Sequence, residues 1–416
     1  MGRKEVAPKG QASEPNSAET SAGAFSFREN SITRRLSSVN RQNVNTLEDS
    51  GVLGITSRLQ SPLGVGASSP VSPSERALAA RVERYALQAA ARALLPGEWV
   101  AQCHRAVVVG RNSVDVMRAA QTSRVYFANL FTCGSVWSCP VCRARITEQR
   151  RMELREAFHC GSAYHTTLVT VTLQHRHDDA LRGLLGMLRT GWSQTKAGKG
   201  WQVIKQRHDL VGYVTALEVT HGENGWHPHL HVLMVGKREL PTSERELLRD
   251  VLVDRFGGYV HALGGYVSEY HGVEVSEPGA ASEYVAKWGI EEELTRGASK
   301  CGAGRGPVQL LRDFLQGDER AGGLYQEYAA ALKGRRQLSW SRGLRALLGL
   351  GEEVTDGDAA AETVAEGDVL LAAIPLAGWQ VILAAGERGA LLCAASLGAE
   401  SLRLWLAERG IVPAAL

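Results

Sequence analysis

The sequence predicts an α+β fold in which helices cover an antiparallel sheet. Two strand-like segments, 212–220 and 226–234, flank a short stretch rich in Gly and Asn, which is typical of a β-hairpin. Segments of helical composition at 180–194 and 242–256 alternate with other strand-like segments. Strands that are joined by a hairpin and interspersed with helices indicate an antiparallel sheet with helices packed on it.

Composition limits the function without assigning it. The 416 residues are 44% hydrophobic, which is enough for one sizeable core and a second small one. A net charge of +3 permits a nucleic-acid partner but does not require one. The apolar stretch 369–385 is interrupted by Pro375 and Gly378. We therefore expect no secretory signal, no membrane contact and a cytoplasmic location.

The N-terminal part is expected to contain a tail and then a cysteine-bearing segment. Residues 1–75 are rich in Ser, Gly, Pro, Asn and charge and have few large apolar side chains, which predicts a disordered tail. A helix from about Pro73 to Leu95 should open the folded part, and the segment 76–160 should consist of this helix and the cysteine motif.

Three cysteines of this segment have the spacing of metal ligands. Cys133, Cys139 and Cys142 can converge on one ion, and Cys103 is a candidate fourth ligand from 30 residues upstream. Disulfides are disfavoured, because the number of cysteines is odd, seven, and the rest of the chain looks cytosolic. We predict a structural Zn²⁺ site. Its fourth ligand is less secure than the other three, since the alternatives are His104, His159 and Cys160.

The next region, 161–300, is expected to form one domain. Its expected elements are a strand at 166–173, the helix 180–194, the hairpin, the helix 242–256, short strands at 259–276 and a helix near 281–288.

The hairpin carries a predicted metal site. Side chains two apart on a strand share a face, so His229 and His231 can bind one ion. A hairpin closed over 221–226 places Glu218 opposite His229 and sorts polar and apolar side chains onto opposite faces. We predict Glu218 as the third ligand of a divalent cation, with His227 as a reserve ligand. The alternative is that these are surface or partner-bound histidines.

A tyrosine and a lysine share one face of the last helix of this region. Tyr284 and Lys287 are three residues apart and are neighbours at helical spacing. A phenol with a pKa near ~10 needs help to act as a nucleophile, and a nearby cation favours the phenolate. Alone the pair is weak evidence, because most such tyrosines pack in a core. Beside a metal site it predicts a nucleophile.

These motifs together resemble those of a known superfamily. His229-Leu230-His231, followed by an apolar run, and Tyr284-Val285-Ala286-Lys287 resemble the metal motif and the Tyr-x-x-Lys motif of the HUH endonucleases. Within them the chain is most similar to the rolling-circle replication initiators (Rep) of small bacterial plasmids, in their single-tyrosine class. Thr170-Val171-Thr172-Leu173 resembles their first motif and 226–231 their second, and the resemblance covers about residues 100 to 300.

The resemblance implies that 161–300 is an HUH nuclease domain with a ferredoxin-like sheet, and that the protein is a metal-dependent endonuclease that nicks and rejoins plasmid origin DNA. Mn²⁺ or Mg²⁺ on His229, His231 and Glu218 would polarise the scissile phosphate. Tyr284 would attack it, which leaves a 5′ phosphotyrosine and a free 3′ hydroxyl, and Lys287 would orient Tyr284 or stabilise charge. The implied partners are single-stranded and double-stranded origin DNA, a host helicase and a polymerase. Homo-oligomerisation stays open.

The sequence departs from some relatives at the step that ends the cycle. Those relatives carry a carboxylate four residues before the tyrosine, whereas this chain has Ala280 there. Glu277 and Glu283 do not have the matching spacing, and position 288, where a second tyrosine would stand, is Trp288. The termination mechanism therefore stays open.

Basic residues outside the motifs are candidates for DNA contact. They gather after the cysteine motif, near Trp192 and Trp201, and in a helical segment at 301–350 that also carries Trp340. The predicted contacts are Arg143, Arg145, Lys196, Arg335 and Arg336. The alternative for the first two groups is a solvated face, and for 301–350 it is packing on the nuclease domain.

The C-terminal part is expected to be separate from the nuclease domain. Residues 351–368 are predicted to be an acidic linker, and residues 369–416 a small module with two strands and a helix around Leu402 and Trp405. Two other functions are compatible with the motifs. One is an HUH transposase or relaxase, and the other is a non-enzymatic, zinc-dependent DNA-binding regulator.

Overall fold

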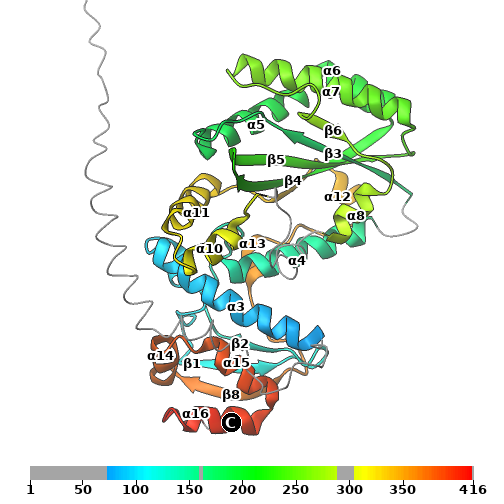
Figure 1. Cartoon of the computed structure of the whole chain (residues 1–416). Helices are drawn as coiled ribbons and strands as arrows, with labels where there is room; N and C mark the ends of the chain where they lie inside the picture. The colour runs from blue at the N-terminus through cyan, green and yellow to red at the C-terminus, as the bar shows by residue number, and fades with distance from the viewer. Residues whose placement is uncertain (1–72, 159–162, 288–303, 415–416) are drawn as a thin grey trace, which may run out of the picture. The chain divides into compact units, whose positions relative to one another are not determined.

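The predicted hairpin lies at the centre of a five-stranded antiparallel sheet. The computed structural model describes residues 73–158, 163–287 and 304–414. The strands are β3 (His165–Thr172), β4 (Leu210–Gly222), β5 (Gly225–Gly236), β6 (Val273–Val275) and β7 (Leu338–Trp340). A tight turn joins β4 to β5, and the order across the sheet is β6-β3-β5-β4-β7 (Figure 1). Alternating side chains with many β-branched residues favour these strands.

The two faces of this sheet pack against different helices. These are α4 (Pro140–Ala157), α5 (Leu181–Thr195), α6 (Gly198–Arg207), α7 (Thr242–Ala262) and α8 (Ala280–Lys287). One face buries Val171 and Val232 together with the apolar sides of α5, α6 and α7. Figure 1 shows these three helices on the same side of the sheet. The other face buries Val214 and Leu233 together with residues of α4 and α8. Since the strand period is two, β5 turns its histidines to this second face.

This architecture confirms the predicted α+β fold with an antiparallel sheet covered by helices. The strand expected at 166–173 and the helix expected at 180–194 correspond to β3 and α5 within one residue at each end. In 259–276, where short strands are expected, α7 instead continues to Ala262 and one strand, β6, follows. The sequence does not predict α6 or the short edge strand β7.

A second sheet is built from two segments that are far apart in the sequence. β1 (Ser113–Arg118) pairs antiparallel with both β2 (Val125–Ala128) and β8 (Val369–Pro375). Phe127 and Trp379 meet in its core, with ring centroids 5.3 Å apart. The helices α14 (Leu376–Ala384), α15 (Arg388–Leu397) and α16 (Ala399–Ala407) complete it. The expectation of a separate module with two strands and one helix is therefore corrected, because β8 completes a sheet begun by β1.

Helix α3 (Pro73–Leu94) connects the two cores and matches the helix predicted from Pro73 to Leu95. Its Leu87 and Leu94 are buried in the main core, whereas Tyr85 also packs against the core of the second sheet. A short 3-10 helix, η1 (Trp99–Ala101), follows and leads to Cys103.

The segment 301–350, over the part that the structure describes, packs on the domain of the five-stranded sheet. It contains α10 (Pro307–Leu315), α11 (Glu319–Leu332), β7 and α12 (Leu344–Leu347). Leu310, Tyr325 and Tyr328 are buried in the main core, and β7 is an edge strand of the five-stranded sheet. The sequence left DNA contact and packing open for this segment, and packing accounts for its apolar side chains.

The predicted acidic linker, 351–368, is a packed part of the fold. It contains the short helix α13 (Asp356–Ala360), whose Ala360 is buried in the main core. Its carboxylates form ion pairs with arginines of other segments, namely Glu353 with Arg336, Asp356 with Arg150, and Glu362 with Arg124 and Arg145. The segment is therefore not a linker, because its acidic side chains pair with arginines that are distant in the sequence.

Among the residues that the structure describes, no single helix is long and apolar enough to cross a membrane, and α14 and α15 meet that test only as a bent pair. Several predicted features lie outside the described residues. They are residues 1–72 of the predicted tail, His159, Cys160, Trp288 and the side chain of Lys287.

Candidate metal centres and nucleophile

The hairpin register brings three potential metal ligands to one point. Glu218 on β4 stands opposite His229 on β5, which is the pairing expected from the polarity of the two strands. His229 and His231 are two residues apart and share a face. One ligand atom from each of the three residues lies within 4.8 Å of the others.

Both imidazoles of this cluster contact the same carboxylate oxygen. Nε2 of His229 lies 3.1 Å from Oε2 of Glu218, and Nε2 of His231 lies 3.3 Å from the same oxygen. The two histidine side chains are 13% and 16% exposed, but that of Glu218 is 41% exposed. The two histidines are therefore held within the sheet, and the carboxylate faces solvent.

Thr170 on β3 supports one of the histidines. It stands opposite His231, and its hydroxyl lies 3.1 Å from Nδ1 of that ring. When Nδ1–H donates to this hydroxyl, Nε2 keeps the lone pair with which it would bind a cation. For His229, among the described residues, Nδ1 has no hydrogen-bond partner. Thr170 belongs to the motif 170–173, but the sequence does not predict this role.

The charge of Glu218 is set by competing effects. Burial opposes ionisation of the carboxyl group, but hydrogen bonds from His229 and His231 and the charges of these rings hold its pKa far below the usual range. Glu218 is therefore an anionic oxygen donor at neutral pH.

Tyr284 lies beside the cluster. Helix α8 carries it onto the same face of the sheet, where its ring centroid is 4.7 Å from that of His231. Its hydroxyl donates a hydrogen bond of 3.4 Å to Oε1 of Glu218. Burial and the charge of Glu218 raise the pKa of this phenol well above its ordinary value. Tyr284 thus donates to Glu218 as a neutral phenol.

Two other predicted participants have different partners. His227 does not join the three-residue cluster, since its Nδ1 lies 2.9 Å from Nε2 of His175. Glu277, a candidate for the missing carboxylate, forms an ion pair with Arg245. The backbone of Lys287 ends α8, three residues after Tyr284.

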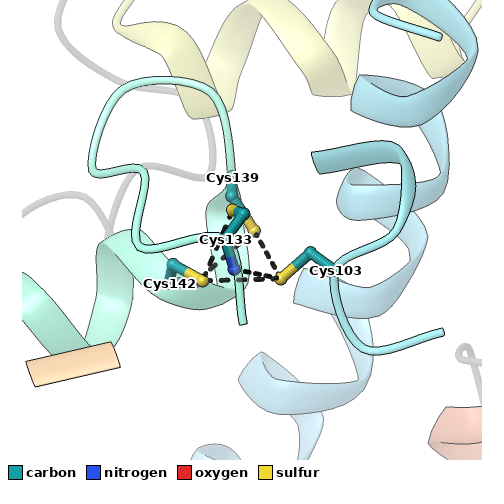
Figure 2. A group of neighbouring side chains, drawn as sticks. All are labelled: Cys103, Cys133, Cys139 and Cys142. Atoms are coloured by element: carbon teal, nitrogen blue, oxygen red, sulfur yellow. Dashed lines mark hydrogen bonds between the residues drawn. The ribbon is translucent and has the colours of Figure 1, made fainter. Parts of the chain in front are cut away.

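The four predicted cysteines form a second cluster, which could bind zinc (Figure 2). Three of their sulfur–sulfur distances, from Cys103 to Cys142, from Cys133 to Cys142 and from Cys139 to Cys103, are 3.5, 3.7 and 3.7 Å. A disulfide needs about 2.05 Å. Sulfurs bound to a tetrahedral Zn²⁺ at about 2.3 Å lie about 3.8 Å apart, which fits the observed spacing.

The cysteine cluster receives hydrogen bonds from several N–H groups. The amides of Cys133 and Cys142 donate to the sulfurs of Cys103 and Cys139, at 3.4 and 3.5 Å. Gln88 on α3 donates to Cys139 at 3.3 Å. Such donors stabilise thiolates. His104, an alternative fourth ligand, is not part of the cluster.

The residues predicted to contact DNA lie on separate elements. Arg143 and Arg145 are on α4, Lys196 follows α5, and Arg335 and Arg336 follow α11. Their side chains have partners within the protein. Arg145 contacts Glu362, and Arg336 contacts Glu353. Lys196 lies 3.2 Å from the Tyr213 hydroxyl, and burial lowers the pKa of its ammonium to about 8.

Comparison with known proteins places this chain in a family. A family model described as "Replication protein" matches residues 126–250. "Protein rep" of Streptomyces lividans is 30% identical over 344 residues, which cover 64% of this chain and 74% of the relative. "Neomycin resistance protein" of Streptomyces cyanogenus is 34% identical over 140 residues, covering 26% of this chain and 31% of that relative. No solved structure matches.

The family model covers ligands of both clusters but not the tyrosine. The family model spans Cys133, Cys139 and Cys142 as well as Glu218 and both histidines, but it ends before Tyr284. The family itself is established by the match to "Protein rep", which covers most of that relative. This chain therefore belongs to the replication protein (Rep) family of plasmid replication initiators.

Proposed function

We propose that this chain starts replication by nicking one strand of its plasmid origin, with Tyr284 as the nucleophile. The observation that carries the proposal is the convergence of Glu218, His229 and His231 within 4.8 Å, with the Tyr284 hydroxyl 3.4 Å from Glu218. Membership of the Rep family supports a role at an origin. Single-stranded and double-stranded origin DNA would be the substrate.

The donor set fits a divalent cation, Mn²⁺ or Mg²⁺, on Glu218, His229 and His231. Two imidazoles and one carboxylate leave coordination positions open, and the carboxylate is 41% exposed, so a phosphate can approach. When bound, the cation would polarise the scissile phosphate and offset its charge. For the four cysteines we propose a structural Zn²⁺, since four thiolates close the coordination shell.

The protein's own side chains would exchange one phosphate ester for another. Oε1 of Glu218 accepts the hydrogen bond of Tyr284 and so orients its oxygen. A bond forms between this oxygen and phosphorus, and the bond from phosphorus to the 3′ oxygen breaks, which leaves a 5′ phosphotyrosine. The proton lost by Tyr284 balances the one gained by the 3′ oxygen. A host polymerase, assisted by a helicase, would extend the 3′ hydroxyl.

The test is the formation of a covalent adduct. Purified protein and MnCl₂ are incubated with single-stranded oligonucleotides that tile the origin of its own plasmid, followed by denaturing gels. We expect an adduct with the wild type and none with Tyr284→Phe. A matched control is Tyr270→Phe, which removes the hydroxyl of a tyrosine that is 80% exposed. It should form the adduct normally.

The other outcomes separate the alternatives. An adduct that survives Tyr284→Phe would move the nucleophile to another residue. Specific origin binding without any adduct would favour a non-enzymatic regulator. A strong preference for a transfer origin over the replication origin would favour a relaxase.

A further inference from the structure

Three buried side chains link a C-terminal helix to the cysteine cluster. Arg388, at the start of α15, donates a hydrogen bond of 2.7 Å from Nη1 to Oε1 of Gln88 on α3. Nε2 of Gln88 in turn donates to Sγ of Cys139 at 3.3 Å. Gln88 is fully buried and Arg388 is 4% exposed, so the link lies inside the protein. We call it the Arg388–Gln88–Cys139 path.

Arg388 determines which end of the Gln88 amide faces the sulfur. A guanidinium has only N–H donors, whereas a side-chain amide has a donor end and an acceptor end. Gln88 must therefore turn its oxygen toward Arg388, and its NH₂ group then points to Cys139. Nη1 of Arg388 also donates to the carbonyl oxygen of His104 at 3.2 Å, next to Cys103. Arg388 thus acts on the cluster through groups that adjoin it.

The position of Arg388 is itself fixed by packing. Its guanidinium lies over the ring of Tyr85, 4.6 Å from the ring centroid. Gly389 allows α15 to approach α3 closely, because a Cβ at this position would lie 2.8 Å from Cγ1 of Val82. A side chain that is locked in this way can hold its hydrogen-bond partner in one orientation.

The charge of Arg388 also suits the cluster. Four thiolates outweigh the charge of Zn²⁺, so the loaded cluster would be an anion, and a buried anion is costly without a cation nearby. Burial lowers the pKa of Arg388 to about 10 and that of Arg92 to about 9, while negative charge on Cys103 and Cys139 opposes this shift. Both arginines are therefore cations at neutral pH. Among the carboxylates that the structure describes, none influences either guanidinium.

We propose that Arg388, acting through Gln88, is a positioning residue of the cysteine site and strengthens its hold on Zn²⁺. The segment that follows β8 would then contribute to the metal site, although it supplies none of the ligands. The proposal rests on the proposed structural Zn²⁺. The alternative is that Arg388 and Gln88 are only a satisfied polar pair in the packing of α15 on α3.

The first test measures zinc affinity on the full chain. Zinc-loaded protein is titrated with a chromophoric chelator, pyridylazoresorcinol, and the partition of Zn²⁺ at equilibrium gives the relative affinity. For Arg388→Met, which removes the charge and the donors, we expect the affinity to fall roughly 10- to 100-fold. Arg388→Lys keeps the charge and a donor and should lose less. The control, Arg403→Met, changes an arginine of α16 that is 67% exposed and should bind zinc normally.

A second variant, Gln88→Glu, separates positioning from packing. It keeps the shape of the side chain and gives Arg388 a carboxylate partner, so the packing alternative predicts that the fold and the zinc affinity are retained. The carboxylate, however, offers Cys139 no N–H and adds negative charge beside the sulfur. We therefore expect the zinc affinity to fall at least about tenfold. In the Co²⁺-substituted protein, the sulfur-to-cobalt charge-transfer band should move to longer wavelength, because the sulfur loses a hydrogen bond.

The results that would overturn the proposal are specific. One is a zinc affinity of folded Arg388→Met equal to that of Arg403→Met. Another is a wild-type zinc affinity or an unchanged charge-transfer band in Gln88→Glu. Thermal unfolding of the zinc-loaded samples shows which variants are folded. If Arg388→Met does not fold, Gln88→Glu decides, since it retains Arg388.

Failure of the zinc site itself would look different. In that case the purified wild type contains no zinc and takes up no Co²⁺, so there is no affinity to compare. If only the positioning role is wrong, the wild type and the variants at Arg388 and Gln88 all bind zinc alike.

Discussion

The two ligand clusters of this protein differ in how they meet solvent. Cys103, Cys139 and Cys142 are at most 1% exposed, and four sulfurs complete a tetrahedral set. The other cluster offers three ligands, with Glu218 exposed by 41%. Structural metal sites are closed, whereas catalytic sites keep a position for substrate. This contrast supports the proposal that the cysteines contribute stability and that the hairpin carries the chemistry.

The clusters also differ in how the chain assembles them. Glu218, His229 and His231 belong to one hairpin, so the sheet fixes their positions without a metal. The cysteines come from separate segments, since Cys103 follows η1, Cys133 follows β2 and Cys142 lies in α4. An ion there would tie these segments together. The loss of each ion should therefore have a different consequence.

The largest expected effect is on stability. Cys139→Ser should remove bound zinc and lower the free energy of unfolding by at least about 4 kcal/mol, because metal binding contributes directly to folding. Zinc content and denaturant unfolding measure both quantities. Cys393→Ser, outside the cluster, is the control and should change neither. A zinc-free Cys139→Ser protein with wild-type stability would contradict the assignment.

The opposite pattern is expected at the hairpin. His231→Ala should lower the rate of origin nicking at least about hundredfold, because it removes a ligand of the proposed catalytic cation. Its free energy of unfolding should fall much less than that of Cys139→Ser, by at most about 2 kcal/mol, because strand pairing on both sides of β5 holds this position without an ion. Gel assays and denaturant unfolding test this. Unfolding of the variant would make the cluster structural.

A smaller effect should sharpen the comparison. Thr170→Val removes the hydroxyl that lies 3.1 Å from Nδ1 of His231. We expect Mn²⁺ affinity, measured by titration with electron paramagnetic resonance, to fall roughly 10- to 100-fold. Thr166→Val on the same strand, opposite Val235 rather than a histidine, should leave the affinity unchanged. Equal losses in both variants would deny Thr170 a specific role.

Local periodicity explains what the sequence could predict. The pairing of Glu218 with His229 follows from alternating polarity over a short hairpin, and the structure has that register. The cysteine set follows from ligand spacing in the same way. The choice of Cys103 over His104 could not be made from neighbours in sequence, because the backbone places only one of them in the cluster.

Distant partners explain what the sequence could not predict. β1 pairs with β8, and the sequence pattern of neither strand reveals the other across the intervening five-stranded sheet and its helices. β7 has three residues, too few for a periodic signal. The acidic segment has the composition of a linker, but Glu362 and Asp356 find arginines that only the folded chain brings near.

The most direct test of the contrast between the clusters is one chelation experiment. Purified protein is dialysed briefly against EDTA, and zinc content, thermal stability and origin nicking are measured on the same sample. We predict that nicking is lost while zinc and stability are retained, and that adding Mn²⁺ restores nicking. Nicking that persists in EDTA, or that disappears only in proportion to lost zinc, would contradict a catalytic cation on the hairpin distinct from a structural ion on the cysteines.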